Sequence, residues 1–160
     1  MFAELMLLAA VAVNTAHFAL TLSGTWERVA SKDSIAYRRG ADTVFITTYA
    51  PAEPLSKSEL VSRAKQIATM RRDLINDLAR GQATSSDVVR SERNDQIAFS
   101  FDGEDRRNDK RYAITVVALS KVVVTVALYR PITEADAGFV DLQRDIVSTL
   151  RDQRSSAVGP

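Results

Sequence analysis

Two long apolar runs, separated by two polar residues, constrain this chain more than any other feature of its sequence. Tyr112–Leu119 and Val122–Tyr129 carry apolar or β-branched residues at nearly every position, and Ser120-Lys121 lies between them. Strands that are apolar on both sides must be covered on both faces. A tight connection forces two neighbouring strands to pair antiparallel. The sequence therefore predicts a central β-hairpin buried inside a layered domain.

Two amphipathic helices are expected to supply that cover. Ser56 and Glu59 form an S-x-x-E capping box, and the apolar residues after it recur at the spacing of one helical face, which predicts a helix over residues 57–80. A second helix is predicted to begin at Thr133, with Asp136 as its capping partner. Its apolar side presents Phe139, Leu142, Ile146, Val147 and Leu150.

The remaining strands are shorter and several of them alternate. They are predicted at His17–Ser23, around Ile35 and Tyr37, and at Thr43–Tyr49, Val88–Ser91 and Ile97–Phe101. The polar stretch Asp102–Arg111 is predicted to be a loop. The fold class is therefore α+β: an antiparallel sheet of about six strands covered by two long helices, an α/β/α sandwich.

The N-terminal residues 1–16 are interpreted as a signal peptide cleaved near Ala16. The run Leu5–Val13 has the length of a signal-peptide core and is too short to span a bilayer, which takes about 20 apolar residues. Glu4 and the absence of Lys or Arg before the run count against this interpretation. The alternative is an N-terminal helix that packs on the domain. A periplasmic location follows from the first interpretation and a cytoplasmic one from the second.

The chain of 160 residues fits one domain, predicted over 17–151 with a flexible tail over 152–160. It has no cysteine, which excludes disulfides, thiol catalysis and thiolate metal sites. A net charge of +1 gives no reason to expect nucleic acid as a partner. The single histidine, His17, has no cysteine or G-x-S-x-G serine to activate, and no Gly-rich phosphate loop occurs. We expect no enzyme activity, cofactor or metal.

Charged side chains are the candidates for a partner-binding surface. Because Arg binds carboxylates bidentately, Arg38-Arg39 and Arg71-Arg72 are candidates for contact with an acidic partner. The stretch Asp102–Arg111 has four carboxylates, which suggest a calcium site or a carboxylate pair for hydrolysis. Its spacing fits no calcium loop, however, and its basic residues would neutralise such a site. Solvated surface is the alternative for all of these. The predicted partner-binding residues are Arg38, Arg39, Arg71, Arg72, Asp102, Glu104, Asp105, Arg106 and Arg107.

Several segments together resemble the Mog1/PsbP-like superfamily, and within it the small bacterial DcrB-like proteins. They are Phe18–Leu22 with Trp26 beyond, Leu55–Leu60, the strands Ile114–Leu119 and Val122–Tyr129, Arg130-Pro131, and Ser148–Arg151. The resemblance covers about residues 17–151 and implies an α/β/α sandwich around an antiparallel sheet. The superfamily includes a Ran-binding protein, photosystem subunits, envelope lipoproteins and chaperones of secreted effectors, most of them non-catalytic. No site motif carries over, and the lipobox cysteine of the lipoprotein members is missing.

The function expected from these observations is binding without catalysis. The leading hypothesis is an exported protein-binding module, for example an immunity protein or a chaperone for a secreted toxin or effector. The alternative is a small-ligand or lipid-binding envelope protein with a pocket between helix and sheet. That alternative follows from Val116–Val126, whose apolar surface two helices would not fully close. The expected partner is another protein, with no nucleic acid and no stable membrane span.

Overall fold

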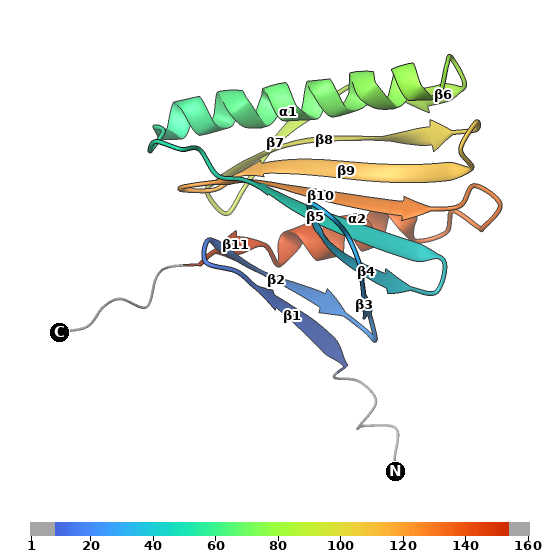
Figure 1. Ribbon diagram of the computed structural model, residues 1–160, viewed down its shortest axis with the longest axis horizontal. Coiled ribbons are helices and arrows are strands. Elements are labelled where there is room, and N and C mark those ends of the chain that lie inside the picture. The colour runs from blue at the N-terminus through green and yellow to red at the C-terminus, as the bar shows by residue number, and fades with distance from the viewer. Residues whose placement is uncertain (1–8, 154–160) are drawn as a thin grey trace, which may run out of the picture.

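The computed structural model describes residues 9–153, an α+β structure with two antiparallel sheets (Figure 1). The larger sheet has eight strands in the order β3-β4-β5-β10-β9-β8-β6, with β7 paired to β8. These strands are β3 (Glu27–Val29), β4 (Ile35–Arg39), β5 (Asp42–Tyr49), β6 (Ala83–Ser85), β7 (Val89–Arg93), β8 (Gln96–Asp105), β9 (Lys110–Ala118) and β10 (Val123–Arg130). The smaller sheet, in the order β1-β2-β11, consists of β1 (Ala10–Asn14), β2 (Phe18–Ser23) and β11 (Arg151–Asp152). The helices are α1 (Lys57–Leu78) and α2 (Phe139–Ser148).

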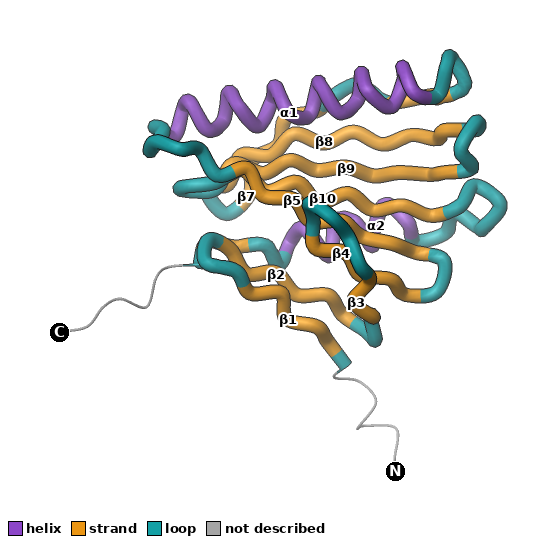
Figure 2. The backbone as a smooth tube through the Cα atoms, in the orientation of Figure 1, coloured by secondary structure: helices purple, strands orange, loops and turns teal. Residues whose placement is uncertain are grey.

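The helix α1 covers one face of the larger sheet, and α2 together with the smaller sheet covers the other (Figure 2). Leu60 and Ala64 of α1 pack over β8 and β9. On the opposite face, Phe139 of α2 joins Phe18 and Leu22 of β2 in a second core. The predicted α+β class is therefore confirmed, but the prediction of about six strands and two long helices is wrong. The helix α2 has 10 residues, and the smaller sheet supplies the rest of the cover.

The predicted central hairpin is confirmed. β9 pairs with β10, and β10 pairs on its other side with β5, so that both strands of the hairpin lie inside the larger sheet. Val116, Val124 and Val126 are each 0% exposed. Burial of such side chains contributes about 1.5–3 kcal/mol each relative to exposure. A near-continuous apolar sequence thus indicates a strand whose two faces are both covered by other elements of the fold.

The start of α1 is also confirmed. The Glu59 N–H donates to the Ser56 hydroxyl (3.2 Å), and the Ser56 N–H donates to the Glu59 carboxylate (2.7 Å), which completes the capping box. The helix ends at Leu78, two residues before the predicted end at Arg80. Arg80 and Gly81 both have left-handed backbone angles, with φ of 49° and 80°, and a right-handed helix cannot continue through them.

The second helix begins at Phe139, so the prediction that it begins at Thr133 with Asp136 as capping partner is wrong. The reason is Arg130, the last residue of β10, which forms a bidentate ion pair with Asp42 at 2.6 and 3.0 Å. The same guanidinium donates to the backbone carbonyls of Ala135 (2.8 Å) and Ala137 (3.0 Å). Those carbonyls face Arg130, so residues 131–138 form turns (Figure 1).

The charged stretch after Phe101 is a β-hairpin, and its prediction as a loop is wrong. β8 continues to Asp105 and β9 begins at Lys110. Arg111 pairs across the hairpin with Glu104 at 3.2 Å. At Gly103, a methyl group would overlap the Thr84 carbonyl and the Tyr112 ring, so glycine is what allows β6 to pair here. Cross-strand pairs therefore extend the ladder through a stretch whose composition indicates a loop.

Both ends of the domain differ from the sequence interpretation. Ala10–Asn14 form a strand that pairs with β2, and Val13 is buried (4% exposed), so the alternative of an N-terminal helix is wrong for these residues. Residues 1–8 lie outside the described part, and cleavage near Ala16 stays a prediction. Asp152, expected in a flexible tail, pairs with Phe18 and accepts hydrogen bonds from Ser120. The rest of that tail, residues 154–160, also lies outside the described part.

Breaking the Asp42–Arg130 pair should be strongly destabilising. Both side chains are largely buried, so Asp42→Ala or Arg130→Met leaves an unpaired buried charge, and we expect either change to lower the free energy of unfolding by about 3–5 kcal/mol. The double variant should lose less than the sum of the two. Urea unfolding measures all three. Asp141→Ala, which breaks an exposed ion pair with Arg144, is the matched control and should cost under about 1 kcal/mol. Equal losses in the free energy of unfolding for Asp42→Ala and Asp141→Ala would contradict the prediction.

The stability should fall at alkaline pH because of two tyrosines. Burial raises the pKa of Tyr112, against its hydrogen bond with Ser85, and burial also raises the pKa of Tyr129, against the charge of Arg71. Above about pH 10 the unfolded chain loses these phenol protons while the folded chain keeps them. Stability therefore declines as pH rises from about 10 towards the folded pKa values. Urea unfolding across this range should show a shallower decline for Tyr129→Phe; an unchanged slope would refute the assignment.

Candidate functional site

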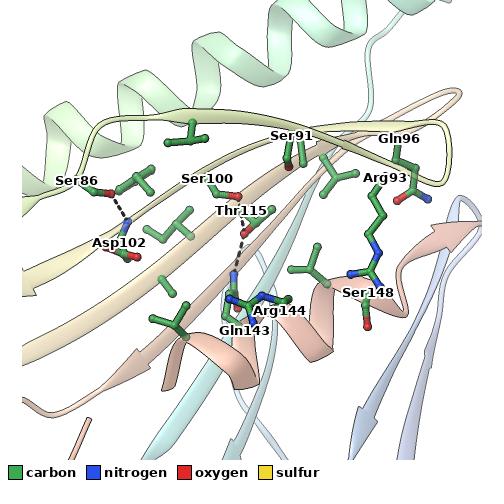
Figure 3. A pocket seen from close by; sticks show the side chains of 18 of the residues that line it. Ser86, Ser91, Arg93, Gln96, Ser100, Asp102, Thr115, Gln143, Arg144 and Ser148 are labelled. Carbon is green, nitrogen blue, oxygen red and sulfur yellow. Dashed lines mark hydrogen bonds between the residues drawn. The ribbon is translucent and has the colours of Figure 1, made fainter. Parts of the chain in front are cut away.

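A cavity of about 370 Å³ lies between α2 and the larger sheet (Figure 3). Its floor is formed by small residues that share one face of two neighbouring strands, Ala98 and Ser100 on β8 and Ala113 and Thr115 on β9. Its opposite wall is the side of α2 that carries Val140, Gln143, Arg144, Val147 and Ser148. The size is at the lower end of ligand pockets, which hold roughly 300–1,000 Å³. Small floor residues leave the space that a larger side chain would fill.

A chain of hydrogen bonds crosses this cavity from the sheet to the helix. The Ser100 hydroxyl donates to the Thr115 hydroxyl (3.1 Å), which also accepts a bond from the Gln143 side-chain amide (3.2 Å) (Figure 3). The same Gln143 nitrogen donates to the backbone carbonyl of Val126 (2.9 Å). A carbonyl accepts and does not donate, so this contact fixes which end of the amide is the nitrogen.

The other end of that amide, the Gln143 oxygen, has no hydrogen-bond partner among the described residues. Gln143 is only 5% exposed, and its Oε1 atom is buried. A buried acceptor without a partner costs about 1–3 kcal/mol, so native structures rarely keep one without a reason. A molecule with an N–H or O–H group, a water or a ligand, would satisfy this oxygen. Gln143 lines the cavity, and among residues 9–153 its oxygen is the buried side-chain acceptor that lacks a partner.

The rim of the cavity is open and mixed in character. Val89 on β7 and Val140 on α2 are exposed apolar residues of the rim (60% and 48%). Arg93 extends from β7 towards Ser148 on α2, while Arg144 forms an exposed ion pair with Asp141 (Figure 3). Exposed apolar side chains around an opening are typical of a site that receives an apolar ligand.

The predicted arginine pairs are each divided between two surfaces. Successive residues of a strand face opposite sides. Arg38 lies on the α1 side of the larger sheet and is exposed, whereas Arg39 lies on the other side, with its guanidinium 4.7 Å from the Trp26 ring. Arg72 donates to the backbone carbonyls of Ser85 and Ser86, so it tethers α1 to β6 and the chain after it. Arg71, one residue earlier, lies about 100° around the helix from Arg72 and is half-buried, and its charge acts to lower the pKa of Tyr129. Thus Arg39 and Arg72 have structural partners, while Arg38 and Arg71 stay available.

The predicted binding residues between Asp102 and Arg107 do not come together in one site. Of the nine predicted partner-binding residues, Asp102 alone lines the cavity. Glu104 pairs with Arg111, and Asp105 accepts two hydrogen bonds from Asn108 within its own turn. Arg106 and Arg107 are exposed in that turn. Within residues 9–153 no group of His, Cys, Asp and Glu is arranged to hold a metal ion.

Reasoning from sequence offered a pocket between helix and sheet as an alternative, but it named for that pocket none of the residues that form this floor and wall. Its floor residues are Ala, Ser and Thr, which carry no chemical signature. One signal was present: small residues alternate at Ala98 and Ser100 and again at Ala113 and Thr115, in two strands that must pair. A second was Gln143, a polar residue within the apolar stripe of the second helix. Together they indicate a gap in the packing with a polar group facing it.

No protein-family model matches this chain. No curated protein matches it either. The structure nonetheless has a recognisable fold, a PsbP-like fold, so the resemblance noted from the sequence is confirmed at the level of the fold. One similar solved structure is that of cyanobacterial PsbP (CyanoP) from Synechocystis sp. PCC 6803, with a TM-score of 0.59 and 10% sequence identity over 90% of this chain and 92% of that one.

A crystal structure from Bacteroides thetaiotaomicron VPI-5482 also matches, with a TM-score of 0.49 and 7% identity over 89% of this chain and 47% of that one. A likeness at that level carries no argument. At 10% identity the likeness to CyanoP concerns the fold alone, and a fold does not fix a function. The narrower resemblance to DcrB-like proteins stays a prediction. Among the described residues, neither helix is both long and apolar enough to cross a membrane.

Proposed function

We propose that this protein binds a small amphipathic molecule in the cavity between α2 and the larger sheet. The observation that carries the proposal is a cavity of about 370 Å³ whose lining includes Gln143, a buried residue whose side-chain oxygen has no partner among the described residues. The ligand has an apolar body, which packs against Ala98, Ala113 and Val117, and a donor group that reaches Gln143. Burial of the apolar body supplies most of the affinity, and the single hydrogen bond sets orientation and selectivity.

Filling the cavity should weaken binding without harming the fold. N-phenyl-1-naphthylamine, an apolar molecule with one N–H group, is the probe, and its fluorescence reports transfer from water into an apolar site. Ala98→Leu places a larger side chain in the floor, so we expect affinity to fall at least about tenfold, or about 1.4 kcal/mol. Ala52→Leu, at an exposed loop position, is the matched control and should bind like the parent chain.

The role of Gln143 is tested with a second probe. In 1-benzylnaphthalene a CH₂ replaces the N–H of the first probe, so the molecule has nearly the same size and no donor. The parent chain should prefer the amine, and Gln143→Leu should remove that preference. Binding of neither probe, or equal binding by Ala98→Leu and the parent chain, would refute the proposed function. Equal affinity of the parent chain for both probes would refute the hydrogen bond to Gln143.

Export to the periplasm remains our second proposal, and it has a structural consequence. Cleavage near Ala16 would remove β1, including the buried Val13, and would leave β2 paired only with β11. Thr15 would also be lost, and its hydroxyl accepts from the His17 and Phe18 N–H groups. We expect N-terminal sequencing of the protein from its native host to find a first residue near His17. An intact Met1 in the mature protein would refute export by this signal.

A further inference from the structure

Three of the exposed large apolar side chains form a row along α1. Met70, Leu74 and Leu78 are 61%, 56% and 62% exposed and are spaced four residues apart, so they follow one side of the helix. The other two exposed large apolar residues within the described chain, Val89 and Val140, line the cavity on the opposite face of the sheet. The row on α1 therefore needs a separate explanation.

The row faces the part of the larger sheet that α1 leaves uncovered. Arg63 lies two turns before Met70 on the same side of the helix, and its guanidinium is 5.5 Å from the Tyr49 ring of β5. Arg72 holds the opposite side of α1 against the chain around β6. The body of α1 packs on β8 and β9, and the side chains on the same face of β5 and at the end of β10 are only partly buried.

Aromatic rings form the floor beside this row. Phe45 on β5 and Tyr129 on β10 meet edge to face, with ring centroids 5.7 Å apart, and both are half-buried, as is Tyr49. We name the row on α1 and these three rings the shelf. Exposed apolar side chains and half-buried rings on one side of a protein are typical of an interaction site.

Positive charges surround the shelf without acidic partners. Arg63 and Lys110 lie over its tyrosine rings, Arg71 is near Tyr129, and Arg38 stands on the same face of β4. None of these four residues takes part in the four ion pairs found within residues 9–153. The chain as a whole is almost neutral, at +1, so this grouping does not follow from composition.

The acidic side chains nearest the shelf form no ion pair with these four residues. Glu27 stands opposite Arg38 on the edge strand β3. Asp73 and Asp77 of α1 turn further towards solvent than Leu74 by helical periodicity. Asp105, near Lys110, is buried and bonded to Asn108. The complement of the shelf is therefore a surface with both apolar side chains and carboxylates.

We propose that the shelf docks an acidic, amphipathic segment of another protein. The apolar side of that segment packs against Met70, Leu74 and the rings, and its carboxylates pair with Arg38, Arg63, Arg71 and Lys110. Charge complementarity selects the partner and speeds its approach, while the apolar contact holds it. This site is distinct from the cavity, which lies on the other face of the sheet, so either proposal can fail alone.

Two matched helical peptides test this proposal on the full chain. One has leucine along one side and glutamate on the other, and its twin has lysine in place of every glutamate. By fluorescence anisotropy at low salt, the glutamate peptide should bind at least about tenfold more tightly than the lysine peptide, and added salt should weaken it. Leu74→Ser should weaken binding of the glutamate peptide as well, because the contact is partly apolar.

Charge reversal identifies the surface. The variant Arg63→Glu/Arg71→Glu should lose or invert the preference for the glutamate peptide over the lysine peptide. The control variant Lys121→Glu/Arg151→Glu makes the same change of charge at exposed sites elsewhere and should keep that preference. Arg38→Glu, on an exposed strand position, serves as a second variant should the first fail to fold by circular dichroism. Ala98→Leu, which closes the cavity, should bind the glutamate peptide normally.

Other occupants give different outcomes, each of which overturns the proposal. Equal binding of the two peptides would show that charge plays no part. Tighter binding to phosphatidylglycerol vesicles than to the glutamate peptide would identify a lipid surface as the occupant. Self-association in sedimentation velocity that Leu74→Ser abolishes would identify a second copy of this chain. Equal effects of both charge-reversal variants would show only a general electrostatic attraction.

Discussion

The ion pair between Asp42 and Arg130 is the contact on which the rest of the α2 side depends. It joins the start of β5 to the end of β10, two strands that already pair, and so it adds little to the sheet itself. Its effect is on the segment that follows, because the same guanidinium holds two backbone carbonyls of residues 131–138. Because of those bonds, α2 begins only at Phe139. The centroid of the Phe139 ring lies 5.2 Å from the guanidinium carbon of Arg130. The position of α2, and with it the wall of the cavity, follows from one buried side chain.

The parts of this fold that local physics decides were predictable from the sequence. The capping box at Ser56 and Glu59 marks the start of α1, and continuous apolar sequence marks the central hairpin, because each signal arises from neighbouring residues. The smaller sheet was not predictable. β11 has only two residues, too few for any periodicity, and its partner β2 is at the far end of the chain. The true start of α2 was hidden for the same reason, since Asp42 lies 88 residues from Arg130.

The candidate sites, like the fold, could be predicted from the sequence only in part. Pairs of arginines in the sequence suggested two binding points, but the alternation of a strand and the turn of a helix separate the members of each pair. Arg38 and Arg71, one from each pair, end on the same side of the larger sheet, while Arg39 and Arg72 bond to backbone carbonyls. The floor of the cavity could not be predicted without knowing which strands pair, because Ala98 and Ala113 share one floor only when β8 pairs with β9.

The pairing of β2 with β11 sets an order on how this chain can fold. Thr21 and Thr149 exchange hydrogen bonds across 128 residues, and Gln153 donates to His17 nearby. The larger sheet is built mostly from hairpins, which close short loops and form early. The smaller sheet closes a loop nearly as long as the whole domain and requires the last strand to be present. A nascent chain on the ribosome can therefore complete the hairpins, but β2 and its apolar side stay without β11 until residues 151–152 have left the ribosome.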